Sequence, residues 1–174
     1  LAAFPNLWWS LANEYDLMAH FERGWWNDFA RFLHENDPYG HLLSNHNCLP
    51  YWDFHDPYTT HCCIQDTCVN RVGMLQREYG KPVVFDEVCY EGNIEHSWGN
   101  ISAFEMAHRF WMAHILGGYC THGETYLNDE EILWWAKGGV LHGESPARIA
   151  FLREIMEELP GDPDVLPGHS GSVD

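Results

Sequence analysis

The stretch PVVFDEV, residues 82–88, joins β-branched and aromatic residues to a pair of acidic residues at its end. This composition is typical of a buried strand. Because strand side chains alternate between two faces, Glu87 shares a face with Val83 and Phe85. If Glu87 points into a site at the end of this strand, we expect Asp86 to point away from it, towards the helices or a loop.

The same kind of unit recurs on both sides of this stretch. Short apolar or β-rich runs that end in polar residues occupy 7–14, 41–47, 59–65 and 118–123. Patterns typical of helices follow in most cases, at about 25–34, 70–79, 102–116 and 145–159. Gly80 suits a helix C-terminus, Ser102 with Glu105 forms a capping box, and Ser145-Pro146 suits the N-cap and first position of a helix.

Strands that alternate with helices at this spacing predict an α/β fold with a parallel sheet. A doubly wound sheet and part of a (β/α)8 barrel both fit. The chain has neither GxGxxG nor GxxxxGK[ST], which weakens the nucleotide-binding versions. In a barrel, catalytic groups lie at the carboxyl ends of the strands, which is where the polar residues fall here.

Two carboxylates end two of the predicted strands, Glu14 in the first run and Glu87 in the fourth. Glycoside hydrolysis needs such a pair, because one group must protonate a poor leaving group while the other attacks the anomeric carbon or activates water. Asn13, next to Glu14, is placed to hydrogen-bond a sugar hydroxyl beside the reacting carbon. The sequence therefore favours a carbohydrate-cleaving site.

WSLANEYD (9–16) resembles the acid/base segment of clan A glycoside hydrolases, where Asn-Glu ends the fourth barrel strand. KPVVFDEVCYEG (81–92) resembles their nucleophile segment on strand seven, and two predicted strands lie between the two segments. WGNISAFEMAHRFW (98–111), GGYCTHGETY (117–126) and LWWAKGGVLHGESPARIAFLREI (133–155) are similar to a bacterial group of apiosidase-like glycosidases of this clan. The resemblance covers about residues 5–160.

This resemblance implies a retaining glycoside hydrolase with Glu14 as acid/base, Glu87 as nucleophile and Asn13 on the substrate, and no cofactor. A full barrel needs about 250 residues, so we expect residues 1–160 to form its C-terminal portion, about strands four to eight. Residues 161–174 are expected to be a linker or a disordered tail. The alternatives are a carbohydrate-binding barrel module without turnover and a metal-dependent hydrolase.

Further polar and aromatic residues near predicted strand ends are candidates for contacts with a poly- or oligosaccharide substrate: His46, His61, Tyr90, His122, Glu124, Tyr126 and Trp135. Glu91 is a rival carboxylate, and Glu144 is expected to support the loop before the last helix. His61, Cys62 and Cys63 invite a zinc site. However, adjacent strand residues do not readily face one metal, so no metal is predicted.

Composition excludes several kinds of partner. The 174 residues carry a formal charge of −17, which argues against nucleic acids and anionic membranes. Neither a signal peptide nor a spanning segment is visible, and localisation stays open. The six cysteines contain no CxxC pair, so buried thiols are favoured over disulfides. Open strand edges in a partial barrel predict self-association.

Overall fold

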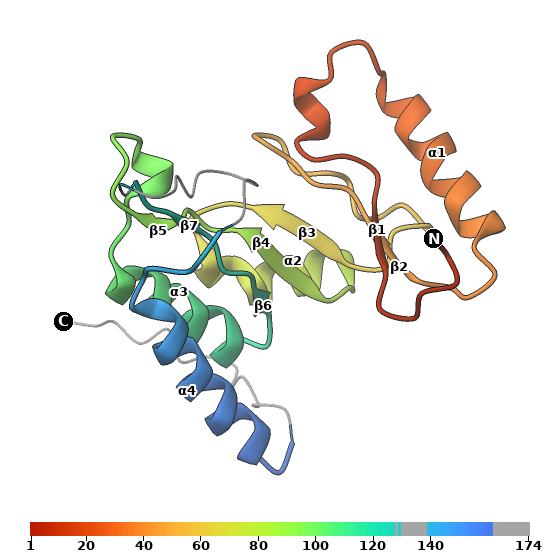
Figure 1. Ribbon diagram of the computed structural model, residues 1–174. Coiled ribbons are helices and arrows are strands. Elements are labelled where there is room, and N and C mark those ends of the chain that lie inside the picture. Colours follow the sequence, from red (N-terminus) through yellow and green to blue (C-terminus); the bar gives the residue numbers. More distant parts are fainter. Residues whose placement is uncertain (128, 130–138, 162–174) are drawn as a thin grey trace.

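A computed structural model describes residues 1–127, 129 and 139–161 of the chain (Figure 1). Five strands lie in the five predicted runs: β1 (Trp8–Ser10), β2 (Leu42–Ser44), β3 (Cys62–Gln65), β4 (Val83–Glu87) and β6 (Tyr119–Cys120). Four helices match the predicted helical patterns: α1 (Arg23–Asn36), α2 (Val72–Tyr79), α3 (Ala103–Ile115) and α4 (Ser145–Glu158).

Several short elements were not expected from the sequence. Two strands of two residues each, β5 (Glu91–Gly92) and β7 (Glu124–Thr125), pair with one another. Three 3-10 helices lie at Tyr15–Leu17, Val69–Arg71 and Ser97–Gly99. Elements this short carry no periodic pattern, and their pairing is set by the surrounding tertiary structure.

All strand pairs among the described residues are parallel. β1 pairs with β2, and β4 lies between β3 and β6. The backbone amide of Thr60 donates to the carbonyl of Leu43 at 2.8 Å, which links the segment before β3 to β2. The predicted α/β fold with parallel strands and alternating helices is confirmed.

The core lies between the strands and the helices that cover them. Val83 and Phe85 of β4 are fully buried, as are Met106 and Ala113 of α3. α3 and α4 lie side by side (Figure 1). Leu152 of α4 is buried and belongs to the core. This packing fixes the strand ends that carry the candidate site.

The helix boundaries follow the predicted caps at two of three positions. Gly80 adopts the left-handed conformation at the end of α2, with φ of 64°. The hydroxyl of Ser102 accepts a hydrogen bond from the Glu105 amide at 3.1 Å. The prediction that Ser145 caps α4 is wrong, because Ser145 is the first helical residue and its hydroxyl instead donates to Glu91.

The prediction of buried thiols holds for three of the six cysteines. All six lie in the described part of the chain and all are free thiols. Cys62 and Cys63 are buried in β3, whereas Cys68 is exposed. No helix in the described part of the chain is long and apolar enough to cross a membrane.

Candidate active site at the carboxyl ends of β1 to β4

Glu14 lies after β1, where the chain turns into the 3-10 helix that begins at Tyr15. Its backbone is left-handed, with φ of 51° and ψ of 56°, a conformation that non-glycine residues rarely adopt. The Tyr15 amide donates to the His46 carbonyl at 2.9 Å, which holds the turn in place. Strained backbone that tertiary contacts maintain is typical of functional sites.

Glu87 ends β4, and its side chain is 17% exposed. Its Oε1 lies 3.1 Å from Nε2 of His46. Burial acts to raise the pKa of Glu87, but hydrogen bonds from His46, Tyr90 and Trp98 outweigh burial and lower it. Glu87 is therefore an ionised carboxylate at neutral pH, the state that a nucleophile needs.

Gln65 connects the two glutamates. Its Nε2 donates to Oε1 of Glu14 at 3.1 Å, and its Oε1 lies 2.7 Å from Nε2 of His46. Its backbone is held by Asn47, whose side chain accepts from the Gln65 amide and donates to the Gln65 carbonyl, both at 3.1 Å. Glu14 and Glu87, predicted as a pair, thus belong to one hydrogen-bonded group.

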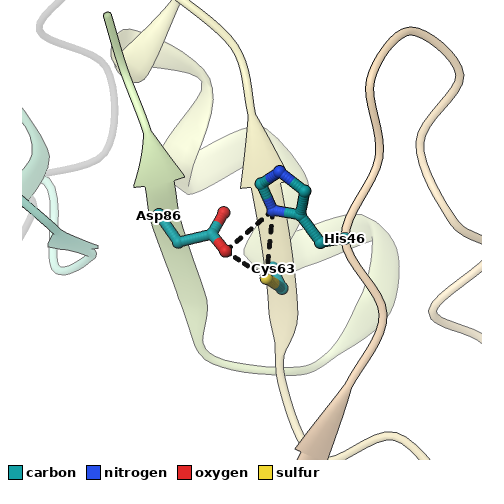
Figure 2. Close-up of side chains that lie close together, drawn as sticks. All are labelled: His46, Cys63 and Asp86. Carbon is teal, nitrogen blue, oxygen red and sulfur yellow. Dashed lines mark hydrogen bonds and ion pairs between the residues drawn. The ribbon is translucent and has the colours of Figure 1, made fainter. Parts of the chain in front are cut away.

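Asp86 and Glu87 both contact the ring of His46, contrary to the expectation that Asp86 points away. Oδ2 of Asp86 lies 2.8 Å from Nδ1 of His46, and the thiol of Cys63 donates to the same oxygen at 2.7 Å (Figure 2). In the β3–β4 register Ile64 pairs with Phe85 but Gln65 pairs with Glu87. Asp86 is the extra residue of this β-bulge, which redirects its side chain.

A second carboxylate group holds the start of α4. The buried Glu91 accepts hydrogen bonds from the Glu144 amide at 2.8 Å, the Ser145 amide at 3.0 Å and the Tyr126 hydroxyl at 2.9 Å. Glu124 accepts from the amides of residues 142 and 143, at 2.7 and 3.0 Å. Glu91, Glu124 and Tyr126 are therefore positioned by the loop before α4.

Tyr90 and His122 make contacts in two different groups. The phenol of Tyr90 hydrogen-bonds Glu87. Burial is the larger cause, and this hydrogen bond the second, of a raised pKa of Tyr90. Gly123 lies against the Tyr90 ring so closely that a Cβ there would overlap it. His122 Nε2 lies 3.1 Å from the Ser145 hydroxyl, and burial lowers the pKa of His122. Tyr90 thus belongs to the Glu87 site, whereas His122 belongs to the α4 loop.

The remaining candidates are His61, Asn13 and Trp135. His61 precedes β3, at the opposite end of that strand from Gln65, and its ring packs edge-on against Trp8. His61 therefore lies beside the amino end of β3, away from the strand carboxyl ends that carry Glu14 and Glu87. Asn13 is exposed beside Glu14. Trp135 lies outside the described residues.

Within the described part of the chain, two clusters bring metal-ligating atoms within 4.8 Å of one another: His46 with Cys63 and Asp86, and Glu91 with His122 and Glu124. In the second cluster both oxygens of Glu91 already accept two hydrogen bonds each, so Glu91 is a poor ligand. In the first, both ring nitrogens of His46 face carboxylates. A cation there would have to displace one of those contacts.

Sequence reasoning missed four residues that the structure brings to the site: Gln65, Cys48, Cys63 and Asp86. Gln65 ends the run 59–65, so the rule that selected Glu14 and Glu87 also points to it. The thiol of Cys48 hydrogen-bonds Glu14, and burial together with this carboxylate raises the pKa of Cys48. No sequence signal announces the bulge that turns Asp86 towards His46.

The chain is similar to a solved structure described as a "putative glycoside hydrolase" from Bacteroides vulgatus ATCC 8482. The sequences are 41% identical with a TM-score of 0.89, and the match covers 93% of this chain and 33% of that one. No protein-family model and no curated protein matches the chain. The chain is thus a homologue of that protein, with the fold of a portion of it, and spans about a third of its length.

Proposed function

We propose that the chain forms about strands four to eight of a (β/α)8 barrel that acts as a retaining glycoside hydrolase. The parallel α/β architecture and the similarity to part of a larger glycosidase-like chain support the proposal. The observation that carries it is the link from Glu14 through Gln65 and His46 to Glu87. This link joins two carboxylates from separate strand ends.

In the first step Glu14 gives its proton to the glycosidic oxygen as the bond from that oxygen to the anomeric carbon breaks. Glu87, ionised before substrate binds, attacks the anomeric carbon from the other side and forms a glycosyl ester. The neutral sugar alcohol leaves with the proton from Glu14. No cofactor takes part in this sequence.

In the second step water attacks the anomeric carbon, and the bond to Glu87 breaks with its electron pair returning to the carboxylate. Glu14, now ionised, takes the proton from the water. Both residues end in their starting states, and the two inversions give a product with retained configuration. In retaining enzymes the two carboxyl groups lie about 5–5.5 Å apart, and we expect this separation between Glu14 and Glu87.

We assign the substrate as a poly- or oligosaccharide held by groups around the two glutamates. Asn13 is adjacent to Glu14. Tyr90 hydrogen-bonds Glu87, which His46 also contacts. Hydrogen bonds from such groups to sugar hydroxyls are expected to strengthen in the transition state. His122, Glu124 and Tyr126 contribute by holding the neighbouring loop.

The decisive experiment compares wild type, Glu87→Gln and Glu14→Gln on a panel of aryl glycosides. Loss of at least about 10³-fold in kcat for Glu87→Gln is expected, because no covalent intermediate can form. A 2-deoxy-2-fluoro glycoside should label Glu87 of the wild type, as read by peptide mass spectrometry. Glu95→Gln, a change at an exposed carboxylate, is the matched control.

Equal rates for wild type and Glu87→Gln would refute the assignment of Glu87 as the nucleophile. Sugar binding without turnover would instead identify a carbohydrate-binding module. The assays use the purified chain and the full gene product that carries it, because the similarity spans only a third of the related protein.

We also propose that the strand edges of the described segment pair with further strands. Among the described strands, β1 pairs only with β2 and β6 only with β4. Trp8 of β1 is 57% exposed, as is Tyr119 of β6. Unpaired edges with large apolar side chains favour association, so sedimentation of the chain alone should show dimers or larger species.

A further inference from the structure

The ring of His46 has a carboxylate at each of its two nitrogens. Nδ1 lies 2.8 Å from Oδ2 of Asp86, and Nε2 lies 3.1 Å from Oε1 of Glu87. A neutral imidazole has one N–H and can donate to only one of these carboxylates. The imidazolium has an N–H at each nitrogen: Nδ1 donates to Asp86, and Nε2 faces both Glu87 and the nearer amide oxygen of Gln65, 2.7 Å away. The geometry therefore matches the charged ring.

The surroundings of His46 favour that charge. Cys63 and Gln65 face the ring from β3, Asp86 and Glu87 face it from β4, and Glu14 lies beyond Gln65. None of these groups is cationic, and two touch the ring as carboxylates. Burial opposes the charge, but the hydrogen bonds with Asp86, Cys63 and Glu87 outweigh burial and raise the pKa of His46 to about 12.

We propose that Asp86 holds His46 as a permanent imidazolium, and that this pair is a positioning device for Glu87 during hydrolysis of the glycosyl-enzyme. This inference rests on the proposed role of Glu87 as nucleophile. It assigns to Asp86 and His46 a part that the sequence did not indicate, since Asp86 was expected to point away and His46 to bind sugar.

The charge acts mainly in the second step. When water attacks, the bond from the anomeric carbon to Glu87 breaks and negative charge returns to the carboxylate. An imidazolium 3.1 Å from Oε1 stabilises that charge and makes Glu87 a better leaving group. The same contact keeps Glu87 ionised in the free enzyme, so it also sets the acid limb of the pH profile.

Cys63 distinguishes this state from a metal site built on the same three side chains. A divalent cation would need the lone pair of Nδ1 and the thiolate of Cys63. An imidazolium offers no lone pair. Burial raises the pKa of Cys63 to about 12, so its thiol remains a donor to Asp86 at 2.7 Å. The imidazolium form of His46 and a metal site on these three side chains therefore exclude one another.

The first test is independent of activity. Nitrogen NMR of the His46 ring should report two protonated nitrogens from pH 6 to 9 in wild type. In Asp86→Asn the ring should titrate within that range. A neutral His46 ring at pH 8 in wild type would overturn the proposal. So would one equivalent of bound zinc that is lost in Cys63→Ser.

The second test follows the chemistry of Asp86→Asn, with Asp28→Asn at an exposed site as control. We expect kcat on an activated aryl glycoside to fall about 10–100-fold with a smaller change in kcat/KM. Glycosyl-enzyme should accumulate, as seen by intact mass, and the acid limb of kcat/KM should move to higher pH. An unchanged acid limb and no accumulation would overturn the positioning role.

His46→Gln serves if Asp86→Asn fails to fold, because a neutral amide of similar reach should give the same accumulation and the same shifted limb. Full activity in Glu87→Gln would refute the proposed function separately, while the protonation state of His46 would still be decided by NMR.

Discussion

Glu91 and Ser145 are joined by two hydrogen bonds, because the amide of Ser145, 3.0 Å away, and its hydroxyl both donate to Oε2 of Glu91. The pairing brings a buried carboxylate to the first residue of α4, where the positive end of the helix dipole favours a negative charge. The strand β5 and the helix α4 are thereby tied together across 53 intervening residues.

Removing the charge of Glu91 should destabilise the fold. Glu91→Gln leaves buried donors without a carboxylate, and hydrogen bonds to charged groups contribute about 1.5–3 kcal/mol each. We expect the free energy of unfolding in urea to fall by roughly 3 kcal/mol. The exposed Glu95→Gln variant should match wild type, and equal midpoints for both variants would contradict the role of Glu91.

Acidification should act on the same interaction. Burial tends to raise the pKa of Glu91, but the bonds from Ser145 and the Glu144 amide lower it below its ordinary value. A carboxyl with a depressed folded-state pKa contributes stability above its unfolded value of about 4.3. That contribution is lost as the pH falls through the folded-state pKa. The free energy of unfolding, measured by chemical denaturation between pH 3 and 7, should fall less on acidification in Glu91→Gln than in wild type.

Gly123 should be the most sensitive glycine for activity. A Cβ at this position would overlap the ring of Tyr90, which hydrogen-bonds Glu87. Gly123→Ala is therefore expected to lower kcat/KM about 10-fold or more by displacing Tyr90. Gly24→Ala is the matched control, since nothing lies within 4 Å of a Cβ there. It should raise the free energy of unfolding by about 0.5 kcal/mol, because Gly24 lies in α1.

Thiol chemistry should single out one cysteine. Cys68 is exposed, whereas burial raises the pKa of Cys62, Cys63 and Cys120 to about 12. Because the thiolate is the reactive form, iodoacetamide should modify the native chain once, at Cys68. Intact mass should show six adducts after unfolding and none on native Cys68→Ser. Rapid labelling of Cys63 in native protein would contradict its contact with Asp86.

The strands were predictable because each carries a local signature. In 82–88 the β-branched and aromatic residues alternate and then give way to acids, and β4 forms there. The polar residue at the end of a run is likewise local information, which is why Glu14 and Glu87 could be singled out. The same rule reaches Gln65, whose role depends on two partners that only the fold brings near.

The remaining features depend on three-dimensional register. Strict alternation sends Asp86 away from Glu87, but one extra residue opposite the step from Ile64 to Gln65 turns it towards His46. A bulge inserts one extra residue into one strand, and the amino-acid composition does not reveal it. Ser145 shows the same limit, because the carboxylate that takes its hydroxyl lies far away in sequence.

The left-handed backbone of Glu14 has a consequence for how this chain tolerates change. Asn and Gly accept φ of 51° at less cost than Glu does, so the backbone alone would select them at position 14. A library screened only for solubility or folding should therefore enrich Gly or Asn there. A library screened for sugar release should return Glu, and the difference between the two outcomes measures how much conformational stability this position gives up for chemistry.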